Sequence, residues 1–118
     1  MNGKVKSEGP NVFDGLGLGI LATIPAVALA VASGGAGHGE YVAARLLFPY
    51  TMLLTMQTHY ISLPLIIIAL LQFPMYGLAI GATTRRKRTR IFVSATLGCI
   101  HGICVALCFS GLLSFLSR

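Results

Sequence analysis

LPLIIIALLQFPMYGLAIGA (residues 63–82), TTRRKRTR (83–90) and IFVSATLGCIHGICVALCFSGLLSF (91–115) follow one another in the C-terminal half of the chain. A helix of 20 residues rises ~30 Å, which matches the hydrocarbon core of a bilayer. Both apolar stretches reach that length. The sequence therefore predicts two membrane-crossing helices joined by a basic loop at 83–90, which faces the cytoplasm under the positive-inside rule. The basic residues of this loop are Arg85, Arg86, Lys87, Arg88 and Arg90.

The composition of the whole chain favours lipid over water as its solvent. Hydrophobic residues make up 55% of the 118 residues and charged residues 10%, and the mean hydropathy is +0.81. A soluble domain carries about 25% charged residues. The net charge of +6 comes largely from the loop between two apolar stretches, which is not the folded basic surface of a nucleic-acid-binding protein. We expect the lipid bilayer as a partner, and no nucleic acid.

The N-terminal part of the chain predicts a flexible polar tail over 1–14 and a first helix over 15–33. That helix would rise ~28 Å and contains Pro25, which lipid-embedded helices tolerate. A cleaved signal peptide over 1–32 is the alternative, because Lys4 and Lys6 precede an apolar run that ends in small residues. Glu8 and Asp14 in the lead-in argue against cleavage.

The run over 41–58 decides the number of crossings. Its 18 residues would rise ~27 Å, and Arg45 near its start would extend its guanidinium back to the membrane interface, but Pro49 interrupts it. We predict an all-α bundle of four transmembrane helices in a single domain over 15–118, with helices at about 15–33, 41–58, 63–82 and 91–115. The alternative is three crossings plus a re-entrant or interfacial helix at 41–58. The positive-inside count slightly favours the alternative, and hydrophobic length favours four.

Small residues predict how the helices pack. Lipid gives apolar helices no hydrophobic reason to associate, so close approach through small side chains must hold them together. The last helix repeats small residues at a spacing of four, and we expect this face to be a main packing face, within the subunit or between subunits. Its residues are Ser94, Gly98, Gly102, Ala106, Ser110 and Ser114. Shorter series occur at Gly77 and Gly81, and at Gly15, Gly19, Ala22, Ala26 and Ala30.

Two polar residues fall near the middle of predicted helices. Gln72 and His101 each lie ~15 Å from the cytoplasmic edge when the helices flanking the basic loop run antiparallel. Polar groups at that depth need partners. We therefore expect Gln72 and His101 to approach each other inside the bundle, together with Tyr76 or Tyr50, in a structural hydrogen bond or on a proton or substrate path.

Metal and haem chemistry find weak support. His101, Cys104 and Cys108 share one helical face at spacings of three and four, which would suit zinc or copper(I), but the same spacing is typical of packing. The three histidines lie at different depths, which disfavours a haem held by two of them. We expect no cofactor, no metal and no catalytic residues.

The sequence thus predicts a non-enzymatic, multi-pass protein of a bacterial inner or plasma membrane. The function that fits best is a structural or accessory subunit that packs through small-residue faces, as a homo-oligomer or on a larger membrane protein. A small oligomeric transporter or channel is the alternative, and a metal- or haem-dependent membrane protein is a third possibility.

Overall fold

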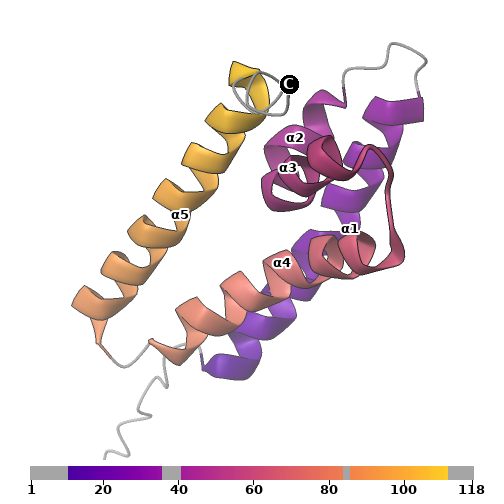
Figure 1. Ribbon diagram of the computed structural model, residues 1–118. Coiled ribbons are helices and arrows are strands. Elements are labelled where there is room, and N and C mark those ends of the chain that lie inside the picture. The colour runs from indigo at the N-terminus through magenta and orange to yellow at the C-terminus, as the bar shows by residue number, and fades with distance from the viewer. Residues whose placement is uncertain (1–10, 36–40, 84–85, 112–118) are drawn as a thin grey trace, which may run out of the picture.

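The computed structural model describes residues 11–35, 41–83 and 86–111. All of its secondary structure in these ranges is helical (Figure 1). The helices are α1 (Val12–Gly35), α2 (Val42–Leu47), α3 (Pro49–Thr58), α4 (Leu63–Ala82) and α5 (Lys87–Ser110).

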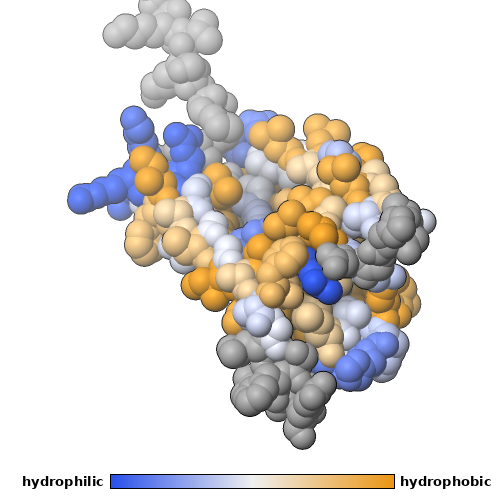
Figure 2. All heavy atoms as spheres, turned by 90° about the horizontal axis from the view of Figure 1, so that it is seen from above, coloured by the Kyte–Doolittle hydropathy of each residue, from blue (hydrophilic) through white to orange (hydrophobic). Residues whose placement is uncertain are grey.

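Three of these helices, α1, α4 and α5, are long and apolar enough to cross a membrane. Few of their residues are buried inside the chain. In an apolar 18-residue stretch of each helix, 11% of the residues of α1 and of α4 are buried, and 6% of those of α5. Large apolar side chains such as Leu18 and Ile103 are more than 60% exposed, and hydrophobic residues cover much of the face seen in Figure 2. Because water would penalise so much exposed apolar surface, the chain is a multi-pass, all-helical membrane protein.

The predicted helix over 41–58 is divided in two. Phe48 leaves the helical conformation, with φ −127° and ψ 54°, and Pro49 begins α3. Proline has no N–H and disfavours the helical conformation of the residue before it. The 6 residues of α2 and the 10 of α3 rise only ~9 and ~15 Å. Neither crosses a bilayer alone, so the four-crossing count is not confirmed.

The other helix boundaries differ less from prediction. The structure reproduces the predicted range of α4, 63–82. The first turn of α5 lies within the predicted basic loop, because α5 begins at Lys87 instead of residue 91. It ends at Ser110 because Gly111 adopts φ 64°, the left-handed conformation that commonly terminates helices. The tail predicted over 1–14 and the first helix predicted over 15–33 are corrected at their boundaries, because α1 runs from Val12 to Gly35. Residues 1–10 of that tail lie outside the described residues.

The long helices alternate in direction. A Cβ placed on Gly81 would lie 3.1 Å from the Cα of Val12, so α1 starts beside the end of α4. A short turn then reverses the chain into α5 (Figure 1). The start of α1, the end of α4 and the start of α5 therefore lie at one end of the molecule, and α2 and α3 lie towards the other end, between α1 and α5 (Figure 1).

The α1–α4 pair is the tightest contact in the fold. A Cβ on Gly77 would overlap the carbonyl oxygen of Gly15, and a Cβ on Gly15 would overlap that of Gly77. One turn further along, a Cβ on Gly19 would overlap the carbonyl oxygen of Phe73. Only glycine permits two backbones to come so close. The small residues of these two helices thus form the main packing surface within the chain.

Candidate functional site

The break between α2 and α3 leaves backbone carbonyl groups without helical partners. In a continuous helix, the N–H groups of Tyr50 and Thr51 would donate to the carbonyls of Leu46 and Leu47. The conformation of Phe48 removes those bonds. A buried polar group without a hydrogen-bond partner costs free energy, and the cost reaches several kcal/mol in a hydrocarbon medium. Donors from other parts of the protein remove that cost.

Side chains from α4 and α5 supply these donors. Gln72 Nε2 donates to the carbonyl of Leu47 at 2.8 Å, and His101 Nε2 lies 2.8 Å from the carbonyl oxygen of Leu46. A carbonyl oxygen only accepts hydrogen bonds, so Nε2 of His101 must carry a hydrogen. The two residues predicted to approach each other are thus brought to neighbouring carbonyls of the broken element, each with its own partner.

Two tyrosines extend the network from the other nitrogen of His101. The hydroxyl oxygen of Tyr76 lies 3.0 Å from His101 Nδ1 and 2.7 Å from the hydroxyl oxygen of Tyr50. A phenol carries one hydrogen, so Tyr76 donates in one of these bonds and accepts in the other. The three rings meet edge to face, with centroids 6.0 to 6.5 Å apart, an arrangement favoured by aromatic quadrupoles.

Arg45 and the buried polar atoms complete the surroundings. The guanidinium carbon of Arg45 lies 5.7 Å from the ring centroid of Phe109, near the end of α5, within range of a cation–π interaction. Its Nε is buried and has no hydrogen-bond partner in the described part of the chain, and the same holds for Thr51 Oγ1 and Gln72 Oε1. Arg45 thus packs against Phe109 of α5, and its predicted extension to the membrane interface stays a prediction.

The cysteines of α5 follow the predicted faces. Cys108 is 1% exposed, Cys104 is half-buried and Cys99 is exposed. The thiol of Cys108 donates weakly to the carbonyl of Pro49 at 3.5 Å. Both ring nitrogens of His101 already have partners. The described residues contain no group of three His, Cys, Asp or Glu side chains that converge on one point.

Two open grooves flank the network. One, of about 320 Å³, runs between α4 and α5 beside Tyr76 and His101. The other, of about 270 Å³, runs between α3 and α4 beside Tyr50, Gln72 and Tyr76. Apolar atoms form nearly all of both linings. The hydrogen bonds of the network join α2 and α3 to α4 and α5, and we call the four side chains that form it the clamp: Tyr50, Gln72, Tyr76 and His101.

The small-residue face of α5 lies beside this clamp but does not pack within the chain. Its described members, Ser94, Gly98, Gly102, Ala106 and Ser110, are all exposed, and Ser114 lies outside the described residues. A Cβ added to Gly98 or Gly102 would meet no atom within 4 Å. The neighbouring face of α5 packs instead, through larger side chains: Leu97, His101, Cys104 and Cys108. Of the two expected arrangements, packing within the subunit or between subunits, the described residues do not show the first, and the second stays a prediction.

Sequence reasoning located Gln72, His101, Tyr76 and Tyr50 but missed their backbone partners. The carbonyls of Leu46 and Leu47 are invisible in side-chain patterns, and the only signal for them is the proline three and two residues later. No protein-family model, curated protein or solved structure matches this chain.

Proposed function

We propose that this protein is a three-crossing subunit of a membrane assembly, and that the small-residue face of α5 is the surface through which it assembles. The observation that carries the proposal is the open space over Gly98 and Gly102, where an added Cβ would meet nothing within 4 Å. Two helices approach closely where both offer small residues, as α1 and α4 do in this chain. A second such face, open over Gly98 and Gly102, is suited to a further helix.

The direction of the helices supports the three-crossing topology. With the start of α1 and the basic turn on one side, that side carries Lys4, Lys6 and the five basic residues of 83–90, seven in all, and the other side carries Arg45 and Arg118. Seven against two follows the positive-inside rule. The N-terminus and the α4–α5 turn then face the cytoplasm, and α2 and α3 form a broken, re-entrant element near the opposite surface.

The occupant that we propose for the face is the same face of a second copy. In a symmetric pair, the same surface patch of both copies forms the interface. Both helices would therefore contribute glycines to it, as α1 and α4 do within the chain. The clamp fits this role because it rigidifies the broken element without presenting reactive groups. A larger membrane protein is the other possible occupant, and purification from native membranes distinguishes the two.

The test adds bulk to the face without disturbing the fold. Leucine replaces both Gly98 and Gly102, where an added Cβ meets nothing within 4 Å, and replacing glycine in a helix favours helix formation by roughly 1 kcal/mol per site. We expect the dimer dissociation constant, measured by fluorescence energy transfer in micelles, to rise at least about tenfold, a change of roughly 1.4 kcal/mol.

The matched control is Thr96→Leu. Thr96 is exposed on the same helix, and two residues place it ~160° around the helix from Gly98. This variant should self-associate as the wild type does. Unchanged association of the double leucine variant, or a wild type that is monomeric and co-purifies with no other membrane protein, would contradict the proposal.

A small oligomeric transporter is the second candidate, and one observation favours it. The α2–α3 element is a helix broken within the membrane, of the kind that many transporters place at their binding sites, and the hydrogen-bonded series of His101, Tyr76 and Tyr50 adjoins the break. Ion or proton flux across proteoliposomes that is abolished by Tyr76→Phe would favour this candidate over a purely structural subunit.

A further inference from the structure

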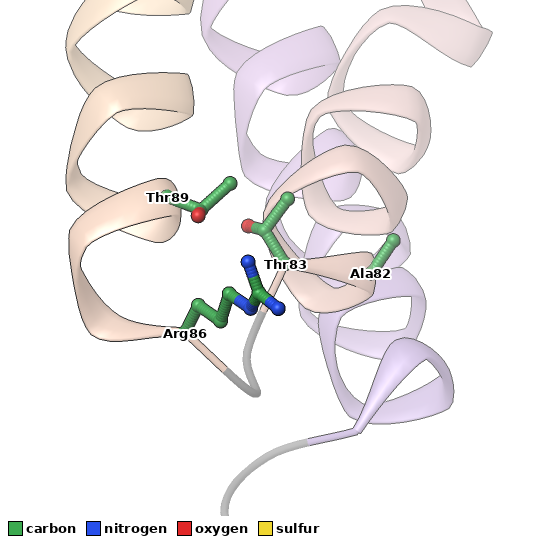
Figure 3. Close-up of a pocket in the computed structure, with 4 residues that line it drawn as sticks. All are labelled: Ala82, Thr83, Arg86 and Thr89. Atoms are coloured by element: carbon green, nitrogen blue, oxygen red, sulfur yellow. The ribbon is translucent and has the colours of Figure 1, made fainter.

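The turn between α4 and α5 contains a pocket with a different character from the apolar grooves. It has a volume of about 230 Å³ and is lined by Ala82, Thr83, Arg86 and Thr89. Figure 3 shows the guanidinium of Arg86 turned towards the space between the two threonine side chains. The pocket thus combines a delocalised cation with hydroxyl groups, at the end of the molecule where α4 stops and α5 starts.

The hydrogen-bonding capacity of the pocket points to an anion. The hydroxyl of Thr89 forms no hydrogen bond within the described part of the chain, so its hydrogen is free to be donated. The hydroxyl of Thr83 already donates to the carbonyl of Ile80 at 2.8 Å. Arginine presents planar N–H groups that match the oxygens of a phosphate and accepts nothing in return. Arg86 and Thr89 are therefore the donors for an oxyanion.

The charge around the pocket is uncompensated. Lys87, Arg88 and Arg90 follow Arg86 directly, and the sole carboxylate among the described residues is that of Asp14. That carboxylate accepts a hydrogen bond from the backbone N–H of Asn11, at the start of α1. Four basic residues within five positions repel one another, and an anion from outside the chain would relieve that repulsion.

Apolar side chains immediately beyond the basic residues identify the source of the anion. Ile91 is 58% exposed and Phe92 is 71% exposed. From Arg86 to Ile91 a helix rises ~7 Å, which is about the depth of the polar headgroup layer on one side of a bilayer. A ligand that fits here carries an anionic group next to apolar chains. A soluble phosphate would accept hydrogen bonds in the pocket but would not cover the exposed apolar side chains of Ile91 and Phe92.

We propose that this pocket binds the phosphate of an anionic phospholipid, with Arg86 and Thr89 donating to the phosphate oxygens and the acyl chains lying along α5 beside Phe92. The site is separate from the small-residue face and does not depend on assembly through it. Its specificity rests on the pocket, because the basic residues around it attract anionic lipid without positioning it.

The experiment is a titration of the purified full-length chain in a non-ionic detergent, followed by native mass spectrometry. The probes are dioleoylphosphatidylglycerol, the zwitterionic dioleoylphosphatidylcholine and inorganic phosphate. We expect phosphatidylglycerol to bind at least about fivefold more tightly than phosphatidylcholine, and Arg86→Gln to remove most of that preference. Thr89→Val should weaken binding about two- to fivefold, the effect of losing one hydrogen bond.

Lys87→Gln is the matched control. It also removes one positive charge, but Lys87 is the next residue along the chain and its side chain does not line the pocket. It should change the phosphatidylglycerol affinity by less than about twofold. Circular dichroism shows that each variant keeps its helix content. Equal losses for Arg86→Gln and Lys87→Gln would mean diffuse charge attraction and overturn the site. Inorganic phosphate that competes as strongly as the lipid would overturn the assignment to a lipid.

Discussion

Replacing Gly77 with alanine tests the close approach of α1 and α4. The added Cβ would overlap the carbonyl oxygen of Gly15, a backbone atom that cannot rotate away. The helices must separate, and overpacking of this kind costs about 1–3 kcal/mol. Alanine recovers up to about 1 kcal/mol through its better helix propensity. Because the overlapped atom belongs to the backbone, the cost lies in the upper part of that range, about 2–3 kcal/mol. Subtracting about 1 kcal/mol leaves an expected net loss of about 1–2 kcal/mol, a factor of roughly 5–30 in the ratio of folded to unfolded protein.

Reversible unfolding in mixed micelles, followed by circular dichroism, measures this loss. The matched control is Gly17→Ala on α1, where an added Cβ meets nothing within 4 Å; it should be neutral or stabilise the protein by up to about 1 kcal/mol. The reasoning is refuted if Gly77→Ala is as stable as the wild type, or if Gly17→Ala loses as much stability as Gly77→Ala.

Two further predictions concern the clamp and use the same unfolding measurement. Gln72→Leu should destabilise the protein by about 1–2 kcal/mol, because the Gln72 side chain is 5% exposed and donates to the carbonyl of Leu47, which would lose this donor. An unchanged unfolding midpoint would show that this hydrogen bond contributes nothing to stability. Tyr76→Phe should cost about 1 kcal/mol through the loss of its bonds to Tyr50 and His101, whereas Tyr60→Phe, on a side chain that is 65% exposed, should stay within about 0.5 kcal/mol of the wild type. Similar losses for the two tyrosine variants would remove the hydrogen bonds as the explanation.

Apolar length and periodicity made the long helices predictable. The range 63–82 is apolar except for Gln72 and is followed by a basic cluster, and the structure gives the same range. The end of α5 was harder, because 112–115 remain apolar and the helix ends where Gly111 takes a positive φ. A single glycine within an apolar run does not show whether it continues a helix or terminates it.

The division at Phe48 was the main difference between prediction and structure. Membrane helices tolerate proline at some positions, and Pro25 and Pro74 both lie inside continuous helices. At Pro49 the helix is interrupted, and the carbonyls of Leu46 and Leu47 accept hydrogen bonds from His101 and Gln72. The outcome depends on those distant donors, so the local sequence alone does not decide it.

Small residues indicated that close packing exists but not where it occurs. The six-member series on α5 was the more regular signal, yet the shorter series of α1 and α4 make the intrachain contact. A helix in lipid gains nothing by hiding a small-residue face, so the length of such a series does not show whether its partner lies in the same chain or in another.

The side of the membrane on which each end of the molecule lies is the most direct test of the three-crossing account. In a cysteine-free background, single cysteines at Asn11, Tyr60 and Lys87 would be labelled with a membrane-impermeant maleimide, in intact cells and in inside-out vesicles. Three crossings predict that Asn11→Cys and Lys87→Cys label from the cytoplasmic side and Tyr60→Cys from the opposite side. Labelling of Asn11→Cys together with Tyr60→Cys, on the side opposite Lys87→Cys, would contradict the account.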